Sequence, residues 1–160
     1  MSKTQIYKEV AAQISAIIEG EPNAIARYAS AACVLSEAFD YYFWTGFYLV
    51  DPDTPNELVI GPYQGTLGCL RIQFGQGVCG TAARERKTVI VDDVHEFPGH
   101  IACDVRSNSE IVVPVFDDNG DLAAVLDVDS CSVGSFDDQD KLGLENICQS
   151  LLAGTHQRTS

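Results

Sequence analysis

The chain has 160 residues, of which 46% are hydrophobic and 21% charged, and this composition predicts one globular domain over residues 1–160. A formal net charge of −13 argues against nucleic acid and anionic membranes as partners, because both carry negative charge. No stretch is apolar over the length of a membrane span, and the charged N-terminus lacks the pattern of a signal peptide. We therefore expect a cytoplasmic protein with a small cationic or zwitterionic ligand.

The first forty residues predict two amphipathic helices, because apolar side chains recur at helical spacing. The first pattern runs up to Gly20 and consists of Ile6, Val10, Ile14 and Ile17. The second follows Pro22 and consists of Ile25, Tyr28, Ala32, Leu35 and Phe39.

From residue 43 onward the pattern changes to short runs typical of β-strands. The runs are FWTGFYLV (43–50), NELVIGPYQ (56–64), CLRIQF (69–74) and TVIVDD (88–93), and a short helix, GTAARERK (80–87), precedes the last of them. Next, EIVVPVF (110–116) and DLAAVLDV (121–128) flank a two-residue turn predicted at Asn119-Gly120. Pro114 predicts a bulge or a sheet edge in the first of these two strands, since proline has no N–H to donate.

A final helix is predicted after Ser135, which we expect to be its cap, with Asp137 and Asp138 in the first turn and Gly154 past the end. Helices at both ends of the chain around a mainly antiparallel sheet predict an α+β fold.

Residues 75–80, GQGVCG, match the G-x-G-x-x-G pattern of dinucleotide-binding folds, and Asp92 stands at the distance of a ribose-binding acid. The following helix is too short for a crossover, however, and Arg71 and Gln73 do not suit a strand that is buried on both faces. We interpret the glycines instead as a tight loop that places Cys79 at a helix N-terminus.

The six cysteines differ in their surroundings. Cys33 and Cys148 have apolar neighbours on predicted helices and are expected to pack in the core, and Cys131 is also assigned a structural role. The other three lie in or beside loops with Gly, Pro or His, and they are Cys69, Cys79 and Cys103. These three are either reactive thiols or half-buried structural ones.

Zinc is another interpretation of the same region, with His95, His100 and Cys103 as potential ligands. Their spacing does not match the paired C-x-x-C pattern of structural zinc sites, so we expect no metal.

The predicted hairpin also groups three carboxylates. If residues 119–120 form the turn, Glu110 faces Asp129 across the hairpin. In the same register Val112 faces Asp127, and because side chains alternate along a strand, all three acidic side chains project from one face. Their mutual repulsion predicts a bound ammonium group or a protonated carboxyl; the alternative is a solvated strand end.

Several stretches closely resemble the free methionine-R-sulfoxide reductases, which are single-domain enzymes with the GAF fold. The stretches are GCLRIQFGQGVCGTAA (68–83), DVHEFPGHIACD (93–104) and SNSEIVVPV (107–115), with WTGFYL (44–49) and LDVDS (126–130). Two positions depart from the family pattern: Gly68 stands where alanine is expected, and Cys131 has no counterpart.

The resemblance implies a GAF-like α+β fold, with helices from both termini packed on a mainly antiparallel central sheet. It also implies that Cys103 is the nucleophile, that Cys69 resolves the oxidised intermediate as a disulfide, and that Cys79 is a third redox thiol. Thioredoxin is the implied reductant, and the reaction needs no metal or organic cofactor.

By the same resemblance, Glu110, Asp127 and Asp129 hold the sulfoxide oxygen and the ammonium group of the substrate. Trp44 and Tyr48 cover its S-methyl group, although on their own these two aromatic residues would suggest core packing. The competing interpretation is a non-catalytic GAF module that binds a small molecule, but such a sensor is normally joined to an output domain, for which 160 residues leave no room. The assembly, including a homodimer, is left open.

Overall fold

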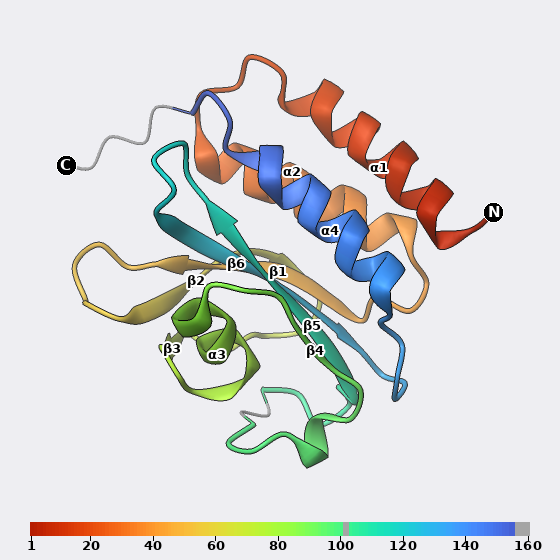
Figure 1. Cartoon of the computed structure of the whole chain (residues 1–160), viewed down its shortest axis with the longest axis vertical. Coiled ribbons are helices and arrows are strands. Elements are labelled where there is room, and N and C mark those ends of the chain that lie inside the picture. The colour runs from red at the N-terminus through yellow and green to blue at the C-terminus, as the bar shows by residue number, and fades with distance from the viewer. Residues whose placement is uncertain (101–102, 156–160) are drawn as a thin grey trace.

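In the computed structural model, which describes residues 1–100 and 103–155, helices cover both faces of a curled antiparallel sheet (Figure 1). The helices are α1 (Lys3–Ile18), α2 (Ala24–Ala38), α3 (Gly77–Glu85), the 3-10 helix η1 (Val94–Glu96) and α4 (Asp138–Leu151). The strands are β1 (Trp44–Val50), β2 (Glu57–Gln64), β3 (Arg71–Gln73), β4 (Val89–Val91), β5 (Ser109–Phe116) and β6 (Leu122–Ser130).

The strands of the described chain form one sheet in the order β3-β2-β1-β6-β5-β4, and all neighbouring strands are antiparallel. Helices α2 and α4 pack on one face of this sheet with α1 outside them, and α3 lies on the other face (Figure 1). The predicted α+β fold, with helices from both ends of the chain packed on an antiparallel sheet, is therefore confirmed. Within the described part of the chain, no helix is long and apolar enough to cross a membrane.

Alternation along the strands divides the interior into two cores. In β5, Ile111, Val113 and Val115 are buried in the core beneath α1, α2 and α4. Glu110 and Val112 point to the opposite face, and Val112 belongs to a second core around α3. The second face therefore carries both an apolar cluster and the acidic residues that were predicted to lie together.

Both helices predicted in the first forty residues are present, but one residue of each predicted buried face is exposed. The buried stripe of α1 runs through Val10, Ile14 and Ile18, whereas Ile17 is 49% exposed. In α2 the first residue of the predicted stripe, Ile25, is also 49% exposed. With 3.6 residues per turn, both exposed residues lie to the side of the buried face of their helix.

The cap of the last helix differs from the prediction. Ser135 does not cap it; α4 begins at Asp138, and Asp137 is its N-cap, with a carboxylate that accepts from the N–H groups of residues 139 and 140. Asp140 accepts a hydrogen bond from the Asp137 N–H in return. This reciprocal pair satisfies more helix-end N–H groups than a single serine hydroxyl could.

The turn of the β5–β6 hairpin also differs from the prediction. It has three residues rather than two, because the Asp117 N–H donates to the Asp121 carbonyl at 2.9 Å. Gly120 adopts the left-handed conformation, with φ of 79°, that such a turn requires. A register shift just after Val115 compensates for the extra residue. The pairing farther from the turn therefore has the predicted register, although the two-residue turn at 119–120 was wrong.

Pro114 lies where β5 forms the edge of the sheet. It pairs with Val125 of β6 on one side, and on the other side β4 pairs only with the residues from Glu110 to Val112. The predicted edge position is confirmed, since no ladder partner on that side needs the N–H that proline lacks.

Candidate active site

A cavity of about 50 Å³ lies on the α3 face of the sheet, at the open end of the β5–β6 hairpin. Seven of the eight predicted site residues line it: Trp44, Tyr48, Cys79, Cys103, Glu110, Asp127 and Asp129. The eighth, Cys69, is bonded to Cys103. The fold thus brings together residues from β1, α3, β5, β6 and two loops.

Cys69 and Cys103 form a disulfide with a Cα–Cα distance of 5.7 Å, inside the usual range for such bonds. Cys69 lies in the loop between β2 and β3, and Cys103 lies in the loop between η1 and β5. Residues 101–102, which belong to the predicted GHIACD motif, lie outside the described residues. A thiol pair that can close at the rim of a cavity is able to deliver two electrons to a molecule bound there.

The two loops are also joined by polar contacts. The Thr66 hydroxyl donates a hydrogen bond of 2.9 Å to the Asp104 carboxylate, beside the disulfide. Arg106 donates to the same carboxylate and, with the other donors, holds the pKa of Asp104 well below its usual range. A charged Asp104 therefore fixes the Cys103 segment against the Cys69 loop.

The three predicted carboxylates share one face of the hairpin, with Glu110 opposite Asp129 and Asp127 opposite Val112. Glu110 is 6% and Asp127 is 5% exposed, so the alternative of a solvated strand end is wrong. Burial, reinforced by the charges of Asp127 and Asp129, raises the pKa of Glu110 well above its usual range. Burial also raises the pKa values of the two aspartates. The patch therefore retains protons that exposed carboxylates would release, and it can protonate a bound oxygen atom.

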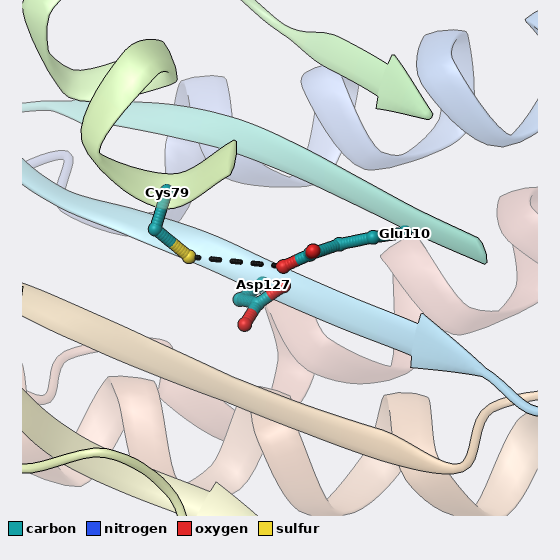
Figure 2. Close-up of side chains that lie close together, drawn as sticks. All are labelled: Cys79, Glu110 and Asp127. Atoms are coloured by element: carbon teal, nitrogen blue, oxygen red, sulfur yellow. Dashed lines mark hydrogen bonds between the residues drawn. The ribbon is translucent and has the colours of Figure 1, made fainter. Parts of the chain in front are cut away.

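Cys79 lies in the first turn of α3, where Gly75 and Gly77 adopt positive φ angles of 87° and 61°. This confirms the interpretation of the glycine pattern as a tight loop that delivers Cys79 to a helix N-terminus. The Cys79 thiol donates to Oε2 of Glu110 at 3.9 Å, and Figure 2 shows the two side chains pointing toward each other. Burial, with the charge of Asp127 next, raises the pKa of the Cys79 thiol well above its usual range. Cys79 is therefore a neutral thiol in this state rather than a nucleophilic thiolate.

An aromatic wall closes another side of the cavity. Trp44 and Tyr48 project from the same face of β1 and their rings stack with centroids 5.8 Å apart. Tyr63 of β2, which the sequence did not single out, stacks behind Trp44 at 5.1 Å. The Trp44 indole N–H donates a hydrogen bond of 2.7 Å to the Thr66 carbonyl, which fixes the ring. The wall offers a rigid apolar surface for a small alkyl group.

His100 is a cavity residue that sequence reasoning considered only as a zinc ligand. Its Nε2 lies 3.8 Å from Oε1 of Glu110. Burial lowers the pKa of His100, and nearby His95 acts in the same direction. The signal that could have found His100 is its position three residues before Cys103 in the motif that carries the resemblance.

The remaining cysteines behave differently from one another. Cys148 is buried at 2% exposure, as predicted. Cys33 is only half-buried, so the prediction of core packing is wrong for it, because it lies toward the edge of the α2 stripe rather than on it. Cys131 is exposed.

The zinc alternative is not supported. His95 is 66% exposed at its side chain and bonds to Asp93 at 2.8 Å. Among the described residues, His95, His100 and Cys103 do not form a group of neighbouring ligand atoms.

Known proteins are similar to this chain over most of its length. The family model described as "GAF domain" matches residues 28–151. The chain is 49% identical to GAF domain-containing protein A of Dictyostelium discoideum, over 94% of this chain and 92% of that protein. It is 42% identical to the free methionine-R-sulfoxide reductase of Escherichia coli, over 94% of this chain and 89% of that enzyme.

A solved structure extends the likeness to three dimensions. The free methionine-R-sulfoxide reductase from Neisseria meningitidis, in complex with its substrate, is 47% identical and superposes with a TM-score of 0.89, covering 94% of this chain and 89% of that one. Fold and site together define a GAF domain with a cysteine pair beside a buried acidic cavity. The chain belongs to the GAF-domain family of free methionine-R-sulfoxide reductases.

Proposed function

We propose that this protein reduces free methionine-R-sulfoxide to methionine and becomes oxidised to a disulfide between Cys69 and Cys103. The observation that carries the proposal is the Cys69–Cys103 disulfide at a cavity that is also lined by buried carboxylates and by Trp44. A thiol pair, a proton source and an apolar wall are what the reduction of a methyl sulfoxide requires.

In the first step the Cys103 thiolate attacks the sulfoxide sulfur while a carboxyl of the acidic patch protonates the oxygen. The oxygen passes to the Cys103 sulfur, methionine leaves, and Cys103 becomes a sulfenic acid. The Cys69 thiol then attacks the sulfenic sulfur and expels water, which forms the disulfide. In sum, one sulfoxide and two thiols give one thioether, one disulfide and one water.

The substrate is oriented by two opposite walls of the cavity. The sulfoxide oxygen and the ammonium group face Glu110, Asp127 and Asp129, and the S-methyl group lies against Trp44 and Tyr48. This orientation brings the sulfur toward Cys103 at the rim. Cys79 lies beside Glu110 as a third thiol near the reacting atoms.

A thioredoxin-type dithiol is the proposed reductant of the disulfide, because the thiols must be regenerated after each turnover. Such recycling suits the reducing cytoplasm, which we propose as the location. Residues 1–160 are proposed to act as one domain. A homodimer would not alter the mechanism, because all the proposed site residues come from one chain.

The test offers the purified, reduced protein three compounds in parallel: free methionine-R-sulfoxide, the free S epimer, and the R-sulfoxide with an acetylated amine and an amidated carboxyl. We expect reduction of the first compound alone, with loss of two thiols per methionine formed, measured by mass spectrometry. The blocked compound lacks the ammonium group, and an unpaired buried carboxylate disfavours its binding. Comparable reduction of the blocked compound would contradict recognition of the charge. Binding of the free R-sulfoxide with no loss of thiols would favour a non-catalytic GAF module.

A further inference from the structure

Three potential metal ligands meet at one wall of the cavity. The Sγ atom of Cys79 and one carboxylate oxygen each from Glu110 and Asp127 all lie within 4.8 Å of one another. Figure 2 shows the three side chains converging from α3, β5 and β6. The set joins one thiol to two carboxyl groups, on three elements that the sheet holds rigidly.

The distances suit a small divalent cation. A tetrahedral zinc ion has bonds of about 2.3 Å to sulfur and about 2.0 Å to oxygen, so two of its ligand atoms stand roughly 3.5 Å apart. The Sγ of Cys79 lies 3.9 Å from Oε2 of Glu110, which requires only a small contraction. Three protein ligands and one open position are the usual arrangement where zinc remains accessible to exogenous molecules.

A second observation points to a cation at this place. Oδ1 of Asp127 is buried and has no hydrogen-bond partner among the described residues, although Asp127 lines the cavity. Leaving a buried carboxylate oxygen without a donor or a cation is unfavourable.

We propose that a thiophilic divalent cation such as Zn²⁺ binds Cys79, Glu110 and Asp127 and thereby inhibits the enzyme reversibly. On binding, the Cys79 sulfur loses its proton to solvent and forms a bond to the metal, and any proton on the two carboxyls leaves in the same way. The ion is an inhibitor here and takes no part in the reaction. Sulfur ligation favours Zn²⁺ or Cd²⁺ over Mg²⁺ and Ca²⁺, which prefer oxygen ligands alone.

Inhibition follows from the ligands that the metal and the substrate share. The proposed function assigns Glu110 and Asp127 to the oxygen and the ammonium group of the substrate, and a metal ion bound to these two residues in the cavity excludes the substrate from those contacts. The same metal would also neutralise the carboxyl groups that protonate the oxygen. Metal binding itself is independent of the proposed function, whereas its inhibitory effect rests on that function.

The experiment uses Cd²⁺ as the probe, because a bond between cadmium and a thiolate gives an ultraviolet charge-transfer band. The background protein is Cys33→Ser/Cys131→Ser, which removes the two free thiols that are not buried. This protein is oxidised so that Cys69 and Cys103 are paired, and it is titrated with CdCl₂ in buffer without other thiols. We expect one cadmium per chain and a thiolate band.

Two further variants in that background locate the site. Cys79→Ser should abolish the band, and Asp127→Asn should weaken binding by at least about tenfold. Asp121→Asn, at an exposed position of the hairpin turn, is the matched control and should bind as the background protein does. Absence of the band from the background protein, or an unchanged band in Cys79→Ser, would overturn the site.

The inhibitory effect is measured separately, on reduced and desalted wild-type protein. Single-turnover formation of methionine from free methionine-R-sulfoxide should stop with saturating Zn²⁺, return on addition of EDTA, and show weaker inhibition when the substrate concentration rises. An unchanged rate with the metal bound would overturn the inhibition. If metal-free protein forms no methionine at all, the proposed function fails, and the cadmium titration still decides the metal site.

Discussion

Replacing Cys69 by serine separates the two halves of the proposed cycle. Reduced Cys69→Ser protein keeps Cys103, the carboxylates and the aromatic wall, so we expect it to form one methionine per chain. It should then stall, because no thiol at position 69 can close the disulfide. Steady-state turnover with thioredoxin should fall by at least about 10²-fold, since an external thiol has a much lower effective concentration than an internal one.

The same substitution has an effect on stability that can be worked out from the loop that the disulfide closes. Cys69 and Cys103 are 34 residues apart in the sequence. Closing a loop of that size in the unfolded chain stabilises the folded state by about 4 kcal/mol at 25 °C. For a chain of this length the melting temperature of oxidised wild-type protein should exceed that of reduced protein by roughly 8–16 °C. Cys69→Ser should show no such difference.

The yield of methionine is measured in a quenched single turnover with free methionine-R-sulfoxide. The effect on stability is measured by thermal unfolding with and without a dithiol reductant. Cys103→Ser is the companion variant and should form no methionine. The double variant Cys69→Ser/Cys79→Ser tests whether Cys79 can substitute as the resolving thiol. Full cycling of Cys69→Ser, or equal yields from Cys103→Ser and wild type, would refute the assignment of the two roles.

Three further substitutions test the walls of the cavity. Glu110→Gln and Asp127→Asn should each lower the single-turnover rate by about 10²-fold or more if these groups protonate or position the oxygen. The control is Glu9→Gln, on the exposed face of α1. Wild-type rates in both cavity variants would show that the acidic patch takes no part in the mechanism. Gly68→Ala would place a Cβ atom 2.6 Å from Cδ1 of Ile60 and 2.9 Å from the Trp44 ring, both closer than van der Waals contact. Alanine is the residue expected at this position in the family, so the flexible end of the Ile60 side chain should move aside and KM should rise by less than about twofold. A rise of about fivefold or more would show that the Trp44 ring had been displaced.

Local periodicity was sufficient to predict the acidic patch. The side chains of a strand alternate, so the even-numbered Glu110 on β5 and the odd-numbered Asp127 and Asp129 on β6 had to share a face once the register was known. The predicted register was correct even though the turn was wrong. The extra turn residue and the register shift after Val115 cancel, and only the pairing in the folded sheet reveals both.

Chemical type and neighbouring residues also distinguished Cys69, Cys79 and Cys103, which have Gly, Pro or His nearby, from the cysteines of α2 and α4. That Cys69 and Cys103 meet could be expected from the family resemblance, but local pattern alone left the pairing open. They lie 34 residues apart on two loops that come together only when β2 and β5 take their places in the sheet. Packing between distant segments has no signature in the spacing of nearby residues.

Tertiary structure alone decided how the acidic residues behave. The same hairpin would leave them solvated if α3 and the Cys103 loop did not cover its open end. Covering that end removes water from Glu110 and Asp127 and places the Cys79 thiol and His100 beside them. Desolvation of a carboxyl group depends on every segment packed around it. The raised pKa values of Glu110 and Asp127, and the Asp127 oxygen without a hydrogen-bond partner among the described residues, therefore follow from tertiary packing and could not be read from the local sequence.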